Sequence, residues 1–259
     1  MKRQTKRADM PRRQRRKRYV INVKKMTLSV LLLLLGIQLV MAACTSPLFY
    51  IRNKRVIGNR IVPKSDVLSR IKIANDANIF LVDKITIVSG IKKNPIVNDV
   101  RIYRLLPETL IIRIIERKPM FVLSTGEKLY EVDRFGIPFR SVKNAYSALP
   151  VISCNVPCVI VGKRPNSSVF NTAMKCLLLA KEKKKFRVEK LTVDQSQNLC
   201  LNVRDGYQVK LGQPDRIEEK LDIAARAVEQ IPEFRQHGEY IDVSCPEAPA
   251  IKSEVTSDQ

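Results

Sequence analysis

Cysteine has the most reactive side chains in this sequence, and six cysteines occur among its 259 residues. Cys154 and Cys158 are separated by three residues in the segment CNVPC, a spacing across which a disulfide can form in an oxidising compartment. The sequence leaves open whether this pair is bridged. A zinc site has weaker support, because neither a second cysteine pair nor paired histidines accompany the segment. Cys176, Cys200 and Cys245 fall in periodic segments, where cysteine commonly packs as a small apolar residue.

Motifs for catalysis or cofactor binding are not found. His237 is the only histidine, which argues against histidine-rich metal sites and most metal-assisted hydrolysis. No two of the nine glycines stand two or five positions apart, which excludes the glycine-rich phosphate loops, and no G-x-S-x-G segment occurs. Carboxylates are scattered, and nothing selects an acid and base pair. We therefore predict a protein that is not an enzyme and has no cofactor, no metal and no small-molecule substrate.

The first fifty residues predict a membrane anchor. Residues 1–25 contain twelve Lys and Arg against Asp9, a net charge of +11, and residues 26–51 contain no charged side chain. The apolar segment MTLSVLLLLLGIQLVMAA has about the length of one transmembrane helix. The positive-inside rule places the basic tail in the cytoplasm and the rest of the chain beyond the membrane. Because topology and anionic lipids explain the tail, nucleic-acid binding is not predicted.

A cleaved signal sequence is the alternative for this segment. Cys44, in VMAAC, distantly resembles the lipid-modified cysteine of a lipoprotein. The charged region is about 25 residues long and the apolar run exceeds the usual 7–15 residues of a signal sequence, which favours a retained anchor. In both cases the chain is tethered to a membrane, with most of it on the far side.

Residues 54–117 predict a small unit with the order strand, helix, helix, strand, strand. KRVIGNRIV is a short β-branched run with Gly58 and Asn59 at a turn or bulge, and a helix begins at Pro63. Asp83 is a good N-cap for a second helix, in which Ile85, Val88 and Ile91 share a face. The segments IVNDVRIY and TLIIRIIE then form a hairpin around LLPE. The apolar character of the last strand predicts a central position in the sheet.

Residues after 118 predict a mostly β unit with two helices. Short strands fit FVLS and KLYEVD, a turn fits RFGIPF, and LCLNV with YQVKL forms a hairpin around Asp205 and Gly206. Helices fit SVFNTAMKCLLLAKEKKK and the segment after Pro214, DRIEEKLDIAARAVEQI. EYIDVSC is a late strand, and PEAPAIKSEVTSDQ is expected to form a polar end. The fold class is therefore α+β.

Several segments together resemble the bacterial cell-division family FtsQ/DivIB. They occur in the order and spacing typical of that family: VIGN, NIFLVD, NPIVNDVRIYRLLPETLIIRIIERKP, EVDRFGIPF, LPVI, VKLGQPDRIEEKL and YIDVS. The resemblance covers residues 54 to about 252, and CNVPC is not part of the family pattern. It implies a basic cytoplasmic tail at 1–25, a transmembrane helix at 26–46, a POTRA domain at 47–118, a β domain at 119–252 and a disordered C-terminal end at 253–259.

The family resemblance also implies a function. Proteins of this family are non-enzymatic, single-pass scaffolds of the division machinery, located at the septum in the cell inner membrane with a cytoplasmic N-terminus. The POTRA domain implies recruitment, and the β domain implies binding of small coiled-coil partners of the FtsB and FtsL type by strand addition at a sheet edge. The candidate edge strand is Ile241, Asp242, Val243, Ser244 and Cys245, although Pro246 and Pro249 would interrupt a long edge ladder.

The segment ERKP is the predicted joint between the two domains, formed by Glu116, Arg117 and Pro119. A charged pair at a strand end is more often a solvated terminus or a structural salt bridge than an interaction site. The rival function is a membrane-anchored POTRA protein that acts in envelope protein transport or assembly. Outer-membrane members of that class carry a β-barrel rich in Gly and aromatics, whereas about 140 residues without tryptophan remain here.

Overall fold

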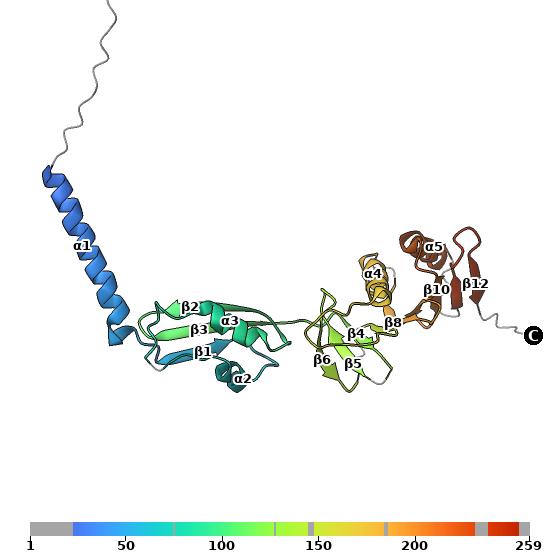
Figure 1. Ribbon diagram of the computed structural model, residues 1–259. Coiled ribbons are helices and arrows are strands. Elements are labelled where there is room, and N and C mark those ends of the chain that lie inside the picture. Colours follow the sequence, from blue (N-terminus) through green and yellow to red (C-terminus); the bar gives the residue numbers. More distant parts are fainter. Residues whose placement is uncertain are drawn as a thin grey trace, which may run out of the picture.

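The computed structural model describes residues 23–74, 76–126, 128–144, 148–183, 186–230 and 238–253. Residues 1–22 of the predicted basic tail, residues 254–259 of the predicted disordered end, and His237 lie outside the described residues. A long helix, a three-stranded sheet and a nine-stranded sheet follow one another along the molecule (Figure 1).

Helix α1 (Val23–Thr45) is the apolar helix expected near the N-terminus. At 1.5 Å per residue its 23 residues extend about 35 Å, enough to cross the hydrocarbon core of a bilayer. None of its residues is buried within the protein, and its mean hydropathy reaches 2.3. It is the one helix in the described ranges that is long and apolar enough to span a membrane.

The three-stranded unit has the predicted order of elements. Its elements are β1 (Asn53–Ile57), α2 (Lys64–Ser69), α3 (Lys84–Lys92), β2 (Val97–Leu105) and β3 (Thr109–Glu116). The predicted central position of β3 is correct, since β1 pairs with it in parallel and β2 pairs with it in antiparallel. Leu110, Ile112 and Ile114 of β3 are buried, as are Ile87 and Ile91 of α3.

Helix α3 corrects one detail of the sequence analysis. Asp83 is the N-cap, as expected, and its Oδ1 accepts a hydrogen bond of 2.8 Å from the Ile85 N–H. Of the predicted apolar face, Ile91 is buried and Val88 packs against the core, but Ile85 is wrong, since it is 81% exposed. Ile87 takes its place, because it lies one turn before Ile91 on the same face of the helix.

The predicted turn at Gly58 depends on a residue without a Cβ. Gly58 has a φ of +82°, and a Cβ at this position would lie 2.4 Å from the carbonyl oxygen of Ile114. Only glycine meets both conditions without strain.

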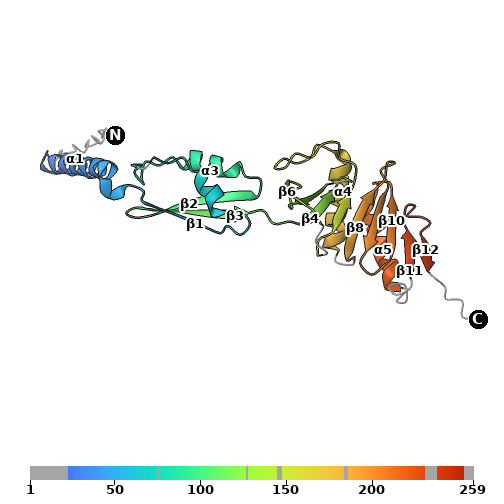
Figure 2. The ribbon, with the colours of Figure 1, turned by 90° about the horizontal axis from the view of Figure 1, so that it is seen from below.

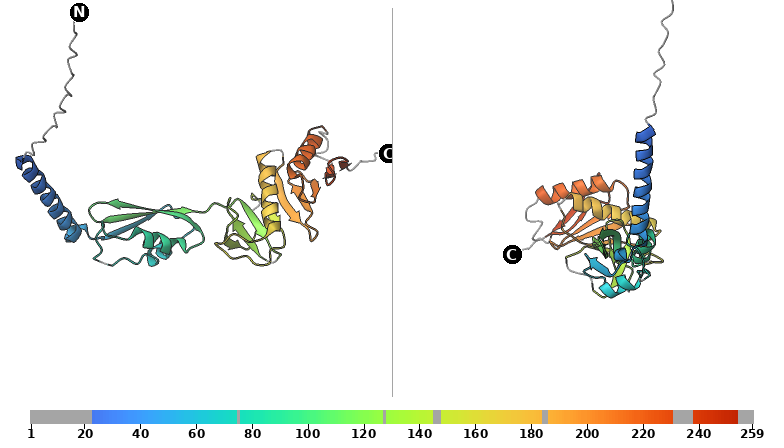
Figure 3. Two further views of the ribbon diagram at one scale, coloured as in Figure 1. Left: turned by 45° about the horizontal axis from the view of Figure 1, so that its top comes forward. Right: turned by 90° about the vertical axis from the view of Figure 1, so that its left-hand side faces the viewer.

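The nine-stranded sheet has the order β12-β11-β10-β9-β8-β7-β4-β5-β6. Helices α4 (Ser168–Glu182) and α5 (Ile217–Gln230) pack on one of its faces (Figures 2 and 3). The other bounds are β4 (Phe121–Ser124), β5 (Leu129–Val132), β6 (Pro138–Val142), β7 (Val151–Ser153), β8 (Val188–Val193), β9 (Leu199–Val203), β10 (Gln208–Gly212), β11 (Gly238–Asp242) and β12 (Ala250–Ser253).

Hydrophobic periodicity predicted most of this second unit. In the predicted hairpin of β9 and β10, Leu199, Leu201 and Val203 face the same core as Val209 and Leu211. Helix α5 begins at Ile217, three residues after Pro214. Its buried apolar stripe, which the spacing of the predicted helix indicates, consists of Ile217, Leu221, Ala224, Ala225 and Val228. The final segment was expected to be a polar end, yet it contains β12. Four residues carry too weak a local pattern to be recognised, and β12 is defined by its pairing with β11.

Candidate partner-binding site

The predicted edge strand is not at the edge of the sheet. Strand β11 pairs with β10 on one side, where Ile241 lies opposite Val209, and with β12 on the other, where Ile241 lies opposite Ile251. The strand itself ends at Asp242. The expectation that residues 241–245 form an open edge is therefore wrong, because the chain returns after Pro249 and adds one more strand.

The three remaining residues of the predicted edge form the exit from β11. Val243 is buried, and its N–H donates to the Lys210 carbonyl oxygen over 2.9 Å. The Ser244 N–H donates to Oδ1 of Asp242 over 2.9 Å, and the Ser244 and Cys245 side chains are exposed. This segment is thus held by the sheet and is not free to accept another strand.

Strand β12 is the outer strand at this side of the sheet. In the described part of the chain β12 pairs with β11 alone, so its other side presents backbone N–H and C=O groups to the surroundings. Ala250, Ile251 and Lys252 are all exposed. Ile251 is 42% exposed although its partner Ile241 is fully buried on the face covered by α5. The apolar layer under α5 is therefore incomplete at β12.

The connection from β11 to β12 is fixed to the start of α5 by an ion pair. Arg216 Nη1 lies 2.8 Å from Oε1 of Glu247. The hydrogen bond from Arg216 lowers the pKa of Glu247 from 4.5 to about 2. Both side chains are solvent-accessible, so the pair positions the connection more than it stabilises the fold.

The opposite edge of the sheet, at β6, is partly covered by the chain itself. The Gly162 N–H donates over 2.7 Å to the carbonyl oxygen of Pro138, the first residue of β6. Beneath this edge, Arg140 makes a two-pronged ion pair with Glu131, with distances of 2.8 Å and 2.7 Å. The Glu131 side chain is only 1% exposed.

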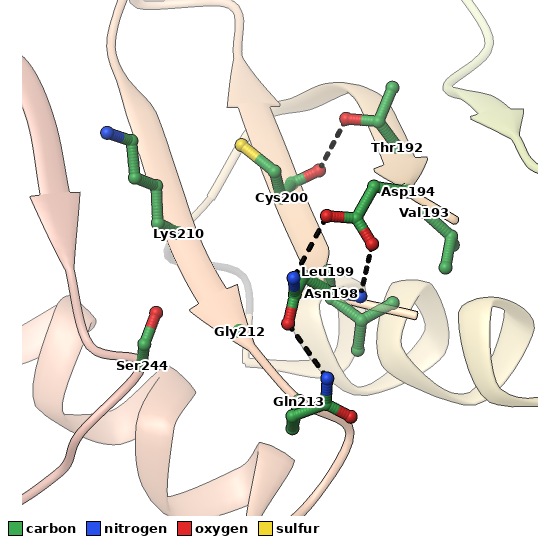
Figure 4. Close-up of a pocket in the computed structure, with 10 residues that line it drawn as sticks. All are labelled: Thr192, Val193, Asp194, Asn198, Leu199, Cys200, Lys210, Gly212, Gln213 and Ser244. Carbon is green, nitrogen blue, oxygen red and sulfur yellow. Dashed lines mark hydrogen bonds between the residues drawn. The ribbon is translucent and has the colours of Figure 1, made fainter. Parts of the chain in front are cut away.

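A cavity of about 650 Å³ lies beside β11, where the ends of β8, β9 and β10 meet (Figure 4). Its polar groups bond to one another: Asp194 accepts from the backbone and side chain of Asn198, and Gln213 Nε2 donates to Asn198 Oδ1 over 3.0 Å. The Asn198 side chain is the main reason that the pKa of Asp194 is lowered. A self-satisfied network of this kind is structural, because its groups are already occupied.

Two further residues of this cavity also lack the properties of catalytic groups. Burial raises the pKa of Cys200, which disfavours the thiolate that a nucleophile needs. Lys210 Nζ lies 3.5 Å from the centre of the Tyr240 ring, a cation–π contact on the face of the sheet opposite the helices. At Gly212, with a φ of +65°, a Cβ would lie 2.8 Å from Ser244 Oγ, so the exit of β11 packs closely against β10.

At the predicted joint, Glu116 binds within the first domain. Its carboxylate accepts hydrogen bonds from the backbone N–H groups of Arg60, Ile61 and Val62, at 2.8, 2.9 and 2.9 Å. Three backbone donors make Glu116 a structural ligand for the loop after Gly58.

Arg117 connects the two domains. Its Nε donates to the Pro95 carbonyl oxygen over 3.0 Å, and its Nη1 lies 2.5 Å from Oδ2 of Asp133. Asp133 also accepts from the N–H groups of Phe135 and Ile137 through its other oxygen. With Pro119, these side chains border a cavity of about 450 Å³. The segment EVDRFGIPF predicts a turn after Asp133, but nothing in its local pattern indicates the contact with Arg117.

The disulfide between Cys154 and Cys158, which the sequence leaves open, is not formed in the structure. Cys154 and Cys158 are both free; the first is buried and the second is exposed. Burial raises the pKa of Cys154 to about 11, so its thiol is unreactive at neutral pH. Within the described ranges no cluster of three or more His, Cys, Asp or Glu side chains could hold a metal ion.

Comparison with protein families gives two matches that together cover most of the chain. Residues 49–117 match the model "POTRA domain, FtsQ-type", and residues 122–244 match "Cell division protein FtsQ/DivIB, C-terminal". The match to the second model ends before β12.

Individual proteins similar to this chain are named FtsQ or DivIB, the two names in the second family model. The chain is 28% identical over 225 residues to Cell division protein FtsQ of Mycolicibacterium smegmatis, covering 86% of this chain and 62% of the relative. It is 25% identical over 215 residues to Cell division protein DivIB of Clostridium tetani, covering 79% and 80%. The chain thus spans less than two thirds of the mycobacterial relative.

A solved structure of the major extracytoplasmic domain of Geobacillus stearothermophilus DivIB is 13% identical, with a TM-score of 0.29, and the match covers 45% of this chain and 97% of that domain. A score this low supports no structural argument.

Proposed function

The chain belongs to the FtsQ/DivIB family of cell division proteins, which are not enzymes, and from this premise we propose that it is a single-pass scaffold of the division septum. In this proposal the basic tail lies in the cytoplasm, α1 crosses the inner membrane and both sheets lie beyond it. The three-stranded POTRA domain recruits the protein to the septum. The nine-stranded domain binds small coiled-coil division proteins of the FtsB and FtsL type.

The observation that supports partner binding most directly is the open outer side of β12. A segment of a partner adding there would satisfy the unpaired backbone groups and cover Ile251, extending the apolar layer under α5. The β6 side is the weaker candidate, because Gly162 already bonds to the first residue of that strand. The proposed site is therefore β12 with its β11 neighbour, in place of the edge at residues 241–245 predicted from the sequence.

The proposal is tested first by localisation. A fluorescent protein fused to the N-terminus of the full chain should form a midcell band in growing cells of the source bacterium. Deletion of residues 54–117 should abolish the band if the POTRA domain recruits the protein. Uniform envelope fluorescence of the intact chain, with normal division on depletion, would contradict the proposal and favour a role in envelope protein transport or assembly.

A further inference from the structure

The end of helix α1 is bonded directly to the POTRA domain. Asn78 is 6% exposed, and its Nδ2 donates to the carbonyl oxygens of Ala43 and Cys44 over 3.0 and 2.9 Å. These carbonyls belong to the last turn of α1, where no helical partner remains for them. The Ile79 N–H also donates to the Phe49 carbonyl oxygen over 2.8 Å. The domain is therefore attached to the end of α1 through Asn78 and does not merely follow the helix in sequence.

Exposed apolar side chains gather at this same end of the domain, where the segment after α1, the segment before α3 and the turn from β2 to β3 are bonded to one another. Leu48 follows α1, the Phe80 ring lies 5.1 Å from that of Phe49, and Arg104 Nη2 donates to the Phe80 carbonyl oxygen, which ties the end of β2 to this place. We call this group the apolar tip; its members, with their exposed fractions, are Leu48 (62%), Phe80 (38%), Leu81 (66%), Ile85 (81%), Leu105 (50%) and Leu106 (54%).

The charged residues near the apolar tip do not indicate a charged binding partner for it. The basic residues Arg52, Lys84 and Arg104 stand near it, and they are balanced by Asp76, Asp83 and Glu108. Glu108 pairs with Arg52, and Asp83 caps α3. Long basic side chains at the rim of an apolar patch can extend their charges to water while their stems stay apolar. An occupant of the tip would thus be selected by its apolar surface.

We propose that the apolar tip rests in the interfacial layer of the same bilayer that α1 crosses, on the leaflet facing the POTRA domain. This inference rests on the membrane-anchoring part of the proposed function. A bilayer surface lies necessarily beside the end of a spanning helix, and Asn78 holds the tip at that end. Interfacial apolar groups typically enter about 5–10 Å into the boundary between headgroups and acyl chains. The contact fixes the tilt of the POTRA domain on the membrane.

The opposite end of the domain supplies a matched control. Ile57, at the end of β1, is 44% exposed, a value close to that of Leu105. It lies at the far end of a strand that begins next to the tip, since β1 and β3 run parallel from Asn53 and Thr109.

The absence of tryptophan from the sequence permits a direct test. Single substitutions Leu81→Trp, Leu106→Trp, Ile57→Trp and Leu33→Trp are made in the full chain, which is reconstituted in phosphatidylcholine vesicles with and without brominated acyl chains. Leu33 lies within α1 and reports on the anchor itself. All four side chains are exposed, so the fold should tolerate each change. Tryptophan at positions 81 and 106 should be quenched at least about twofold more than at position 57, as expected for interfacial burial.

The outcomes separate the tip from the anchor. Quenching at position 33, with positions 81 and 106 no more quenched than position 57, would overturn the tip contact and leave the anchor intact. No quenching at position 33 would overturn both. Because the vesicles hold no other protein, quenching at 81 and 106 supports lipid as the occupant.

A second variant tests the role of Asn78. Asn78→Asp keeps the oxygen that accepts from the Phe80 N–H but loses the donor to the last carbonyls of α1. Introduced with Leu106→Trp, it should reduce quenching at position 106. The same change combined with Leu33→Trp should leave quenching at position 33 unaltered, whereas equal losses at both positions would argue against a specific tie.

Discussion

The two edge strands of the nine-stranded sheet, β6 and β12, differ in how far their outer backbone groups are covered. At β6, the Gly162 N–H bonds to the first residue of the strand from outside, and Arg140 pairs across to Glu131 of β5, whose side chain is 1% exposed. At β12, no such bond covers the outer side in the described part of the chain, and Ile251 is 42% exposed. An open edge is an aggregation hazard that proteins usually cover. The more exposed edge, β12, is therefore the one at which the proposed partner would add a strand.

The largest expected effect concerns the β6 edge. Glu131→Ala removes the buried carboxylate of this ion pair and both of its hydrogen bonds from Arg140, which should lower the free energy of unfolding by about 2–3 kcal/mol. Urea denaturation of the full chain in detergent, followed by circular dichroism, measures the loss. A change below about 1 kcal/mol would mean that the pair is far less desolvated than the 1% exposure of Glu131 indicates.

The next effect concerns the open edge and partner binding. Ile251→Asp places a charge where the apolar layer under α5 would be completed by a partner strand, so affinity for an FtsB-like or FtsL-like partner should fall roughly tenfold to a hundredfold. Stability of the isolated chain should hardly change because the side chain is exposed. Co-purification and titration with the partner measure the effect; unchanged binding would remove β12 from the proposed site.

A smaller effect sharpens the contrast between the two edges. Lys252 Nζ lies 2.7 Å from Oε2 of Glu239, an ion pair as short as that of Glu131 and Arg140 but with side chains 57% and 45% exposed. Glu239→Gln should therefore cost less than about 1 kcal/mol of folding stability. If Glu239→Gln and Glu131→Ala lower the free energy of unfolding equally under identical urea denaturation, burial does not account for the difference between the two ion pairs.

The smallest effect is a pH dependence at β12. Because Arg216 lowers the pKa of Glu247 from 4.5 to about 2, the contribution of this pair is present above the unfolded pKa and is lost as pH falls from about 4.5 through about 2. The protection of the Cys245, Glu247 and Ala248 amides against hydrogen exchange, taken relative to the intrinsic exchange rate at each pH, should fall over this range in the native chain. In Glu247→Gln this protection should already be low at neutral pH, and an acid-dependent step in that variant would implicate another carboxylate.

Local patterns predicted most helices and strands but missed β6, β7, β8 and β12, and long-range contacts decided the site. Asp83, the β9–β10 hairpin and the α5 stripe follow from caps, turns and periodicity. The strand order of the sheet does not, and this is why β11 was expected at the edge that β12 occupies. Likewise, Glu116 and Arg117 look in sequence like an ordinary charged strand end. The fold brings the loop after Gly58 to Glu116 and brings Asp133 to Arg117, and no local pattern indicates either contact.

Glu116 and Arg117 are neighbours in sequence but hold different parts of the protein, and this arrangement has a mechanical consequence. Glu116 grips the loop at residues 60–62 of the POTRA domain, while Arg117 joins Pro95 of that domain to Asp133 of the next. A pull exerted on the nine-stranded domain by a bound partner is thus transmitted through Arg117 into the first sheet, instead of being absorbed by a slack linker. In the proposed arrangement the two domains therefore move together, with the POTRA domain resting on the membrane at its α1 end.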